Sequence, residues 1–297
     1  MEYISHVRKD IAIYIRRIRL HYRGLAGRGL VEHLHQIRVS ARRLRNALSI
    51  HKNLFTARQL KAWDKSIRQA VEVSSRARDL DVYIHFLNTY VRKPRSVFER
   101  WVLIAFIAAL KKERRKLQTR IIQTLDDFKK RGTLEDITRH LRRPLVGKKD
   151  STQRKICKVA RKKLLRRVKE LMVFEPFVYQ PRKVQELHQM RLAAKHLRYT
   201  LDGFTPIYGP RLPVLIERVV SFHRQLGDIH DYDVWTQHLV RYVRAKVKTK
   251  QEKVVLDKVE RHCQDLRQKT YKAFLRNWSK ARQERFFEGL LEYVYAH

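Results

Sequence analysis

The sequence is short of residues that break helices and of residues that cross-link chains. Its 297 residues include only 9 glycines, 7 prolines and 2 cysteines. So few turn-forming residues exclude the many tight turns of an all-β fold, and a hydrophobic content of 43% argues against disorder. Leucine, arginine and lysine are abundant. We therefore expect an all-α protein.

Cysteine patterns, a signal segment and long apolar runs are also missing. Cys157 and Cys263 lie far apart and in no metal-ligand spacing, which fits a reducing compartment and predicts a cytoplasmic protein. The first residues, MEYISHVRKD, lack an apolar core, so we expect no secretory signal. The longest apolar run, Trp101 to Leu110, is about half a membrane span and predicts a buried helix segment.

Acidic residues are scarce beside basic ones. The sequence has 68 Lys and Arg against 29 Asp and Glu, a formal net charge of +39. A compact chain with this charge repels itself, and a polyanionic partner best explains it. Polyphosphate, RNA, DNA and an acidic membrane face are all candidates at this point.

Catalytic patterns are absent. The sequence has no Gly-rich phosphate loop, no Gly-x-Ser-x-Gly, no His-Glu-x-x-His and no Cys-x-x-Cys. We therefore expect no catalytic residue and no cofactor.

What the sequence does have is an internal repeat. Residues 35–48, HQIRVSARRLRNAL, return as residues 188–201, HQMRLAAKHLRYTL, 153 residues later. On a helix of about 100° per residue, each copy carries one basic row and an opposite apolar face. The two rows are His35, Arg38, Arg42 and Arg45, and His188, Arg191, Lys195 and Arg198. A merely solvated face would not need the same order of cations twice, so the rows predict a shared function.

An acidic element follows each copy. Residues 75–82, SRARDLDV, are answered by residues 227–234, GDIHDYDV, 152 residues later. If each element begins a helix, its carboxylates lie in the first turn, where they cap backbone amides. Alternatively, one carboxylate of each pair orients an Arg or His of the row. The four carboxylates are Asp79, Asp81, Asp231 and Asp233.

A His-x-x-Arg-x-x-x-Arg/Lys-x-x-Arg helix followed by an Asp-x-Asp-Val element, present twice, resembles the CHAD family (conserved histidine α-helical domain). The resemblance implies two helical-bundle halves related by a pseudo-twofold axis, with a central basic groove that binds inorganic polyphosphate. By this resemblance, the two basic rows bind the polyphosphate. The residues that support them are Arg78, Asp79, Asp81, Tyr199, His230, Asp231 and Asp233.

The two copies differ at a few positions. Ser75 stands where the second copy has Gly227, and Arg78 stands where it has His230. An equal role for both halves therefore does not follow. We expect one CHAD domain, residues 1–147 and 148–297 being its halves. Its expected role is non-enzymatic binding that targets the protein to polyphosphate granules or regulates polyphosphate metabolism.

Two other functions stay open. RNA or DNA would satisfy the same charge, although single-strand grooves interleave aromatic residues with basic ones, and Tyr199 is the only aromatic residue in either row segment. A metal-dependent phosphate-processing enzyme would need the Asp pairs to hold magnesium, or His35 and His188 to share a metal. Neighbouring cations oppose both metal sites.

The helix plan repeats as well. We expect the basic rows on helices 30–52 and 184–203, and a long helix in each half, 95–131 and 248–278. A new helix is expected to open at each Asp-x-Asp element. Thr56 is expected to cap a helix, and 133–142 to form a short one.

Overall fold

The computed structural model describes residues 2–27, 29–92, 96–142, 153–208 and 212–296. Among them α-helices and short 3-10 turns occur and no strand does, which confirms the all-α prediction. The chain divides into two compact units, an N-terminal unit, Met1–Asp150, and a C-terminal unit, Ser151–His297. The predicted junction at residues 147 and 148 lies outside the described residues.

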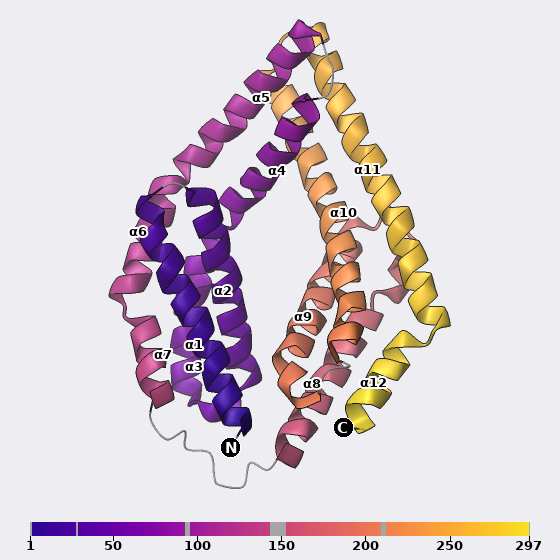
Figure 1. Ribbon diagram of the computed structural model, residues 1–297. Helices are drawn as coiled ribbons and strands as arrows, with labels where there is room; N and C mark the ends of the chain where they lie inside the picture. The colour runs from indigo at the N-terminus through magenta and orange to yellow at the C-terminus, as the bar shows by residue number, and fades with distance from the viewer. Residues whose placement is uncertain (1, 28, 93–95, 143–152, 209–211, 297) are drawn as a thin grey trace. The chain divides into compact units, whose positions relative to one another are not determined.

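The N-terminal unit is built on the pairing of its first helices. Its helices are α1 (Glu2–Arg23), α2 (Leu30–Ile50), α3 (Ala57–Glu72), α4 (Ser75–Val91), α5 (Val97–Lys116), α6 (Gln118–Lys130) and α7 (Thr133–Arg142). Helix α2 packs against α1 on one side and α3 on another, and Figure 1 shows α1 and α2 side by side. Residues Ile11, Leu44, Ile67 and Ile121 are fully buried between these helices. The basic helix α2 is therefore anchored by its apolar face.

The C-terminal unit surrounds one long central helix. Its helices are α8 (Gln153–Met172), α9 (Val184–Tyr208), α10 (Leu212–Lys246), α11 (Lys250–Gln283) and α12 (Phe286–Ala296). Helix α10 packs against α9 and α11, and α8 packs against α9 and α12. The ring of Trp278 lies 5.3 Å from that of Phe222 and 5.2 Å from that of Phe287, centroid to centroid. This aromatic cluster joins α10, α11 and α12.

The repeat extends to helix ends that the sequence motifs did not cover. Ser96 accepts a hydrogen bond from the Glu99 amide at the start of α5, and Thr249 accepts one from the Glu252 amide at the start of α11. Gly132 and Arg285, which precede the last helix of each unit, both have a left-handed backbone, with φ of 62° and 50°. Thr56 caps α3 as expected.

The two units differ in how often their helices break. Helices α3 and α4 are separate, whereas the corresponding α10 runs through 35 residues without interruption. Ser74 and Ser75 explain the break, because their hydroxyls donate to the Val71 carbonyl at 3.0 and 3.3 Å and compete with the helical amide. The counterparts, Leu226 and Gly227, have no hydroxyl.

Some predicted helix bounds were wrong. Neither Asp-x-Asp pair lies in the first turn of a helix: α4 begins at Ser75, with the start of its acidic element, and has no acidic residue in its first turn, while Asp231 and Asp233 lie inside α10. The capping role predicted for these carboxylates is therefore wrong as well. The single helix expected at 95–131 is two, α5 and α6, which meet at Leu117.

The apolar run that begins α5 is only half buried. Val102, Phe106 and Leu110 lie in the core, whereas Trp101 and Ile104 are 58% and 53% exposed. The expectation of a buried segment holds for one face of the helix alone, because the run follows helical periodicity. Within the described residues, every helix is too short or too polar to cross a bilayer.

Candidate functional site

The row on α2 begins with His35, which stands among cations. Burial lowers the pKa of His35, and the charges of Arg78, Arg38 and Arg42 lower it further, while Glu32 opposes them. The effect of Arg78 shows that α4 brings this side chain close to the row. A hollow of about 410 Å³, lined by Arg78, Asp81 and His85, adjoins it. The first end of the row is thus a cationic site with an imidazole held mostly neutral.

Arg38, the second member of this row, is turned into the protein. Its side chain is nearly buried, at 6% exposure of the residue. One guanidinium nitrogen, Nη1, donates to the Val71 carbonyl and to the Ser75 hydroxyl, both at 2.9 Å. The break between α3 and α4 supplies these acceptors. Arg38 therefore already has hydrogen-bond partners in the absence of any ligand.

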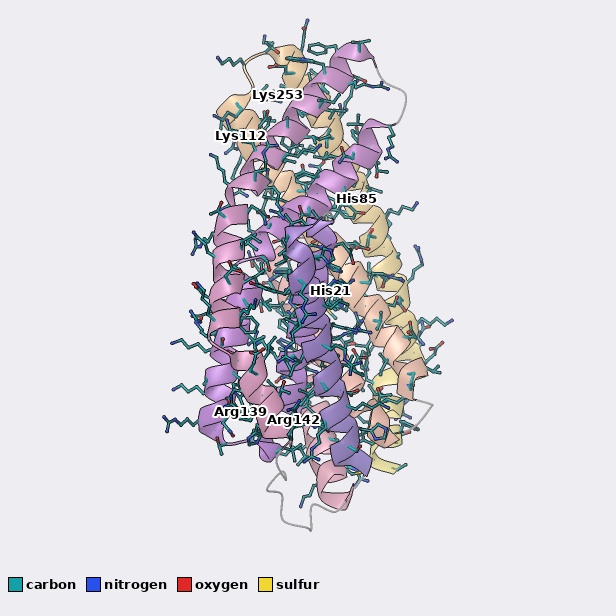
Figure 2. The ribbon with its side chains drawn as sticks, turned by 60° about the vertical axis from the view of Figure 1, so that its left-hand side comes forward. His21, His85, Lys112, Arg139, Arg142 and Lys253 are labelled. Carbon is teal, nitrogen blue, oxygen red and sulfur yellow. The ribbon has the colours of Figure 1, made fainter. Side chains whose placement is uncertain are left out.

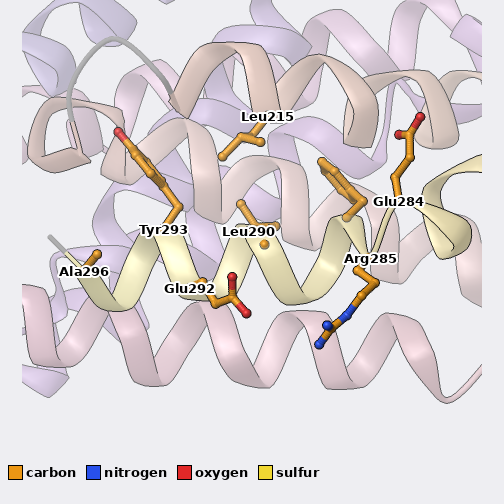
Figure 3. Close-up of a pocket in the computed structure, with 9 residues that line it drawn as sticks. Leu215, Glu284, Arg285, Leu290, Glu292, Tyr293 and Ala296 are labelled. Carbon is orange, nitrogen blue, oxygen red and sulfur yellow. The ribbon is translucent and has the colours of Figure 1, made fainter.

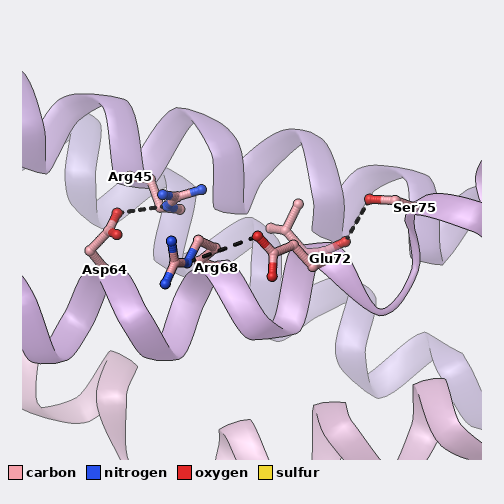
Figure 4. Close-up of polar contacts among 6 residues, drawn as sticks. Arg45, Asp64, Arg68, Glu72 and Ser75 are labelled. Carbon is pink, nitrogen blue, oxygen red and sulfur yellow. Dashed lines mark hydrogen bonds and ion pairs between the residues drawn. The ribbon is translucent and has the colours of Figure 1, made fainter.

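The far end of the same row is also paired within the protein. Arg45 donates through Nε to Asp64 of α3 at 2.8 Å. Figure 4 shows this pair, and beside it the Ser75 hydroxyl bonded to a backbone oxygen. A hollow of about 250 Å³ lies here, lined by Arg45, Lys52, Lys61 and Asp64. Between the two ends, Arg42 is half-buried on the same face of α2.

The row on α9 begins with a stacked pair of imidazoles. The rings of His188 and His230 lie 4.5 Å apart at 30°, so α10 places His230 where α4 places Arg78. Burial lowers the pKa of His188, and His230, Arg191 and Lys195 lower it further. The Nδ1 atom of His188 is buried and has no hydrogen-bond partner among the described residues. Both repeat histidines therefore favour the neutral form in the free protein.

The arginines of the α9 row have fewer internal partners than their counterparts. The Nε atoms of Arg191 and Arg198 are buried without a hydrogen-bond partner in the described part of the chain. Asp202 lies 3.7 Å from Arg198 Nε, which is an ion pair but not a hydrogen bond. Gly227 borders Arg191, since a Cβ there would stand 3.7 Å from Arg191 Nε. This row leaves donors available that the α2 row does not.

Asp81 and Asp233 pair with arginines outside the two rows. Asp81 pairs with Arg114 of α5 at 2.9 Å, and Asp233 pairs with Arg267 of α11 at 2.5 Å. Burial raises the pKa of Asp81, against the opposing charge of Arg114. The sequence reasoning missed Arg114 and Arg267, although they lie 153 residues apart and continue the repeat. The second Asp of each element therefore fastens one helix to the next.

The remaining supporting residues differ in their exposure and contacts. Oδ1 of Asp231 lies 3.3 Å from Nδ1 of His230, within hydrogen-bond distance. Tyr199 is half-buried on α9, directly after Arg198, and Asp79 is exposed on α4. Asp231 thus contacts a side chain, His230, that stacks on the first member of the α9 row.

No cluster of metal-ligating side chains is assembled in the described ranges. No three His, Cys, Asp or Glu side chains there stand close enough to hold a metal ion. A pocket of about 490 Å³ lies away from the row, between α12 and the start of α10. Figure 3 shows Leu215 and Leu290 pointing into it and charged residues such as Glu284 and Arg285 at its edge.

Basic side chains are spread over both units beyond the rows. Figure 2 shows Lys112 on α5, Arg139 on α7 and Lys253 on α11 carried outward from their helices. Such scattered cations attract any polyanion at long range, whereas the rows place several on one face.

Comparison with known proteins agrees with the all-α fold. A family model described as "CHAD domain" matches residues 10–240. The fold is similar to that of PptA from Streptomyces chartreusis, with a TM-score of 0.66 and 15% identity over 93% of this chain and 98% of that one. It is also similar to the CHAD domain from the plant Ricinus communis, with a TM-score of 0.60 and 18% identity over 99% and 92%. No curated protein matches the sequence.

Proposed function

The chain belongs to the CHAD domain family, which is known in general for its relation to polyphosphate, and we propose that it binds inorganic polyphosphate on the basic rows of α2 and α9 without catalysing a reaction. The rows comprise His35, Arg38, Arg42 and Arg45, and His188, Arg191, Lys195 and Arg198.

The observation that carries the proposal is the set of buried polar nitrogens without hydrogen-bond partners on α9, two of which are guanidinium donors. Arg191 Nε, Arg198 Nε and His188 Nδ1 are buried without hydrogen-bond partners among the described residues. A buried donor without an acceptor costs about 1–3 kcal/mol, and a bound anion removes that cost. Phosphate oxygens suit a guanidinium especially well, because its planar fork can grip two of them. The site is thus prepared for an oxyanion with closely spaced charges.

A polymer of phosphate fits the rows better than a nucleic acid does. Single-stranded RNA or DNA gains about 1–3 kcal/mol for each base stacked on an aromatic side chain. Tyr199 is the one aromatic residue within residues 35–48 and 188–201. A linear anion without bases needs only charge and geometry, which the rows supply. Nucleic acid remains the competing ligand that the experiment must exclude.

The carboxylates support binding without catalysis. A phosphate-processing enzyme of the rival kind would use the Asp pairs to hold magnesium. Asp81 and Asp233 are instead engaged by Arg114 and Arg267. An arginine at this position occupies the carboxylate oxygens and repels a divalent cation. The pairs are therefore better suited to holding helices together.

The test is direct competition. Purified protein is titrated with long-chain polyphosphate in the presence of single-stranded RNA at the same phosphate concentration. We expect polyphosphate to displace RNA, and its affinity to fall steeply as salt rises, because bound phosphates release counterions. Incubation of polyphosphate and magnesium with the protein should release no phosphate.

The site itself is tested by charge reversal. The R191E/R198E variant should lose at least about 100-fold in affinity, since two charge-assisted hydrogen bonds of about 1.5–3 kcal/mol each are replaced by repulsion. K272E/R276E, which reverses two exposed cations of α11, is the control with the same change in net charge. Equal losses in both variants would leave only non-specific attraction. In cells, we expect the wild type to reach polyphosphate granules in the cytoplasm and R191E/R198E not to.

A further inference from the structure

Resting on this proposed function, we infer that the α9 row contributes more to the affinity for the phosphate chain than the α2 row does. Arginines of the α2 row are already engaged in hydrogen bonds within the protein. The position occupied by Ser75 in one unit and Gly227 in the other sets the difference. Ser75 acts as a positioning residue, because it bonds the arginine rather than the ligand.

In the N-terminal unit the second arginine of the row is already engaged. Arg38 is 6% exposed and donates through Nη1 to the Ser75 hydroxyl and the Val71 carbonyl. That carbonyl lies near the end of α3, at Glu72, and also accepts from the hydroxyls of Ser74 and Ser75. A phosphate that recruited this nitrogen would have to break or share bonds that exist before it arrives. The net gain from binding Arg38 is correspondingly small.

In the C-terminal unit both acceptors are missing. Gly227 has no hydroxyl, and the carbonyl that corresponds to that of Val71, at residue 223, lies within the unbroken α10, where helical bonds satisfy it. Arg191 Nε is consequently buried without a hydrogen-bond partner in the described chain. The glycine also lets the guanidinium lie close to α10, with 3.7 Å from Nε to a Cβ placed there.

The last arginine of each row shows the same contrast. Arg45 donates to Asp64 at 2.8 Å, a normal charge-assisted hydrogen bond. Arg198 has Asp202 at 3.7 Å, and its Nε has no hydrogen-bond partner among the residues described. At two of the four row positions, the arginine therefore has hydrogen-bond acceptors on α2, whereas the Nε atom of its counterpart on α9 has none among the described residues. An entering phosphate gains more on α9.

Exchanging the two small residues tests the inference. A serine hydroxyl at 227 can reach Arg191 Nε, since it extends one bond beyond a Cβ only 3.7 Å away. We expect G227S to weaken polyphosphate binding about three- to tenfold, the worth of one hydrogen bond to a charged group. S75G should strengthen binding by a smaller factor, because Arg38 keeps the Val71 carbonyl.

If residue 227 had only a structural role, the affinity of G227S would change in the same direction as its stability. Serine is a better helix former than glycine, so G227S should keep or raise the melting temperature. Our inference predicts that its affinity for polyphosphate falls nevertheless. R191Q and R38Q form the matched pair, and R191Q should cost more affinity. A wild type that fails to bind polyphosphate overturns the proposed function. A wild type that binds, with G227S unchanged or with R38Q and R191Q equally weakened, overturns this inference alone.

Discussion

The N-terminal and C-terminal units share a sequence pattern but use it differently. In the N-terminal unit, α3 and α4 are separate helices, and the Val71 carbonyl and the Ser75 hydroxyl between them accept hydrogen bonds from Arg38. In the second, α10 is continuous and Arg191 Nε has no hydrogen-bond partner within the described residues. We infer from this difference that a change as small as serine to glycine separates a binding role from a structural one.

The two units are most alike in the contacts that lie outside the basic rows. The Asp81–Arg114 and Asp233–Arg267 pairs, and the caps at Ser96 and Thr249, occur at matching positions. These contacts join one helix to the next or end a helix, so both units need them for folding. The two units thus share these contacts between helices, while their row arginines differ in hydrogen-bond partners.

The largest effect should come from breaking the shared ion pairs. D81N and D233N each leave a buried arginine unpaired, which costs about 3–5 kcal/mol of unfolding free energy. The loss should be greater for D81N, because the side chains of its pair are 9% and 10% exposed against 13% and 18% for the other. Denaturant unfolding measures both. Recovery of stability in D81N/R114M would confirm the unpaired charge as the cause, and equal losses in D81N and D233N would contradict the ranking by burial.

A smaller effect should appear in the pH dependence of polyphosphate binding. Burial lowers the pKa of His35 and His188 in the free protein, and bound phosphate should raise it, so binding takes up protons. Affinity should therefore increase as pH falls through the raised pKa of the complex and level off below the lowered pKa of the free protein. Each unit of difference is worth about tenfold.

Two variants sharpen this comparison of the units. The guanidinium of Arg78 lowers the pKa of His35 and so opposes its protonation, whereas the neighbour of His188 is a second imidazole, His230, stacked on it at 4.5 Å. H188Q should thus flatten the profile more than H35Q. Isothermal titration over a pH series, with long chains whose internal phosphates stay ionised, gives the curves. An unchanged slope in H35Q/H188Q would remove the histidines from the binding site.

The smallest effect concerns the turn before the last helix of each unit. Arg285 adopts a φ of 50° where the other unit has Gly132 with a φ of 62°. A side chain is strained in this region and glycine is not, so R285G should stabilise the protein by about 0.5–1 kcal/mol. G132A should cost a similar amount. Thermal melting measures both changes, and a lower melting temperature for R285G would contradict the account.

The sequence predicted the helices better than it predicted their partners. Periodicity and capping placed α2, α3, α7 and the start of α9 within a few residues, because these signals are local. The same signals failed at the acidic elements. Asp81 and Asp233 look like first-turn carboxylates, yet their partners Arg114 and Arg267 lie more than thirty residues further along the chain. A contact of that separation has no local pattern from which to infer it.

The sequence alone determined that the protein is helical, strongly basic and internally repeated, since composition and periodicity are properties of the chain itself. It also determined which cations share a helix face, because that follows from residue spacing. Only the tertiary structure decided which of those cations have acceptors. Hydrogen bonding depends on where carbonyls and carboxylates from other helices come to lie, and this separates Arg38 from Arg191 although their sequence neighbourhoods match.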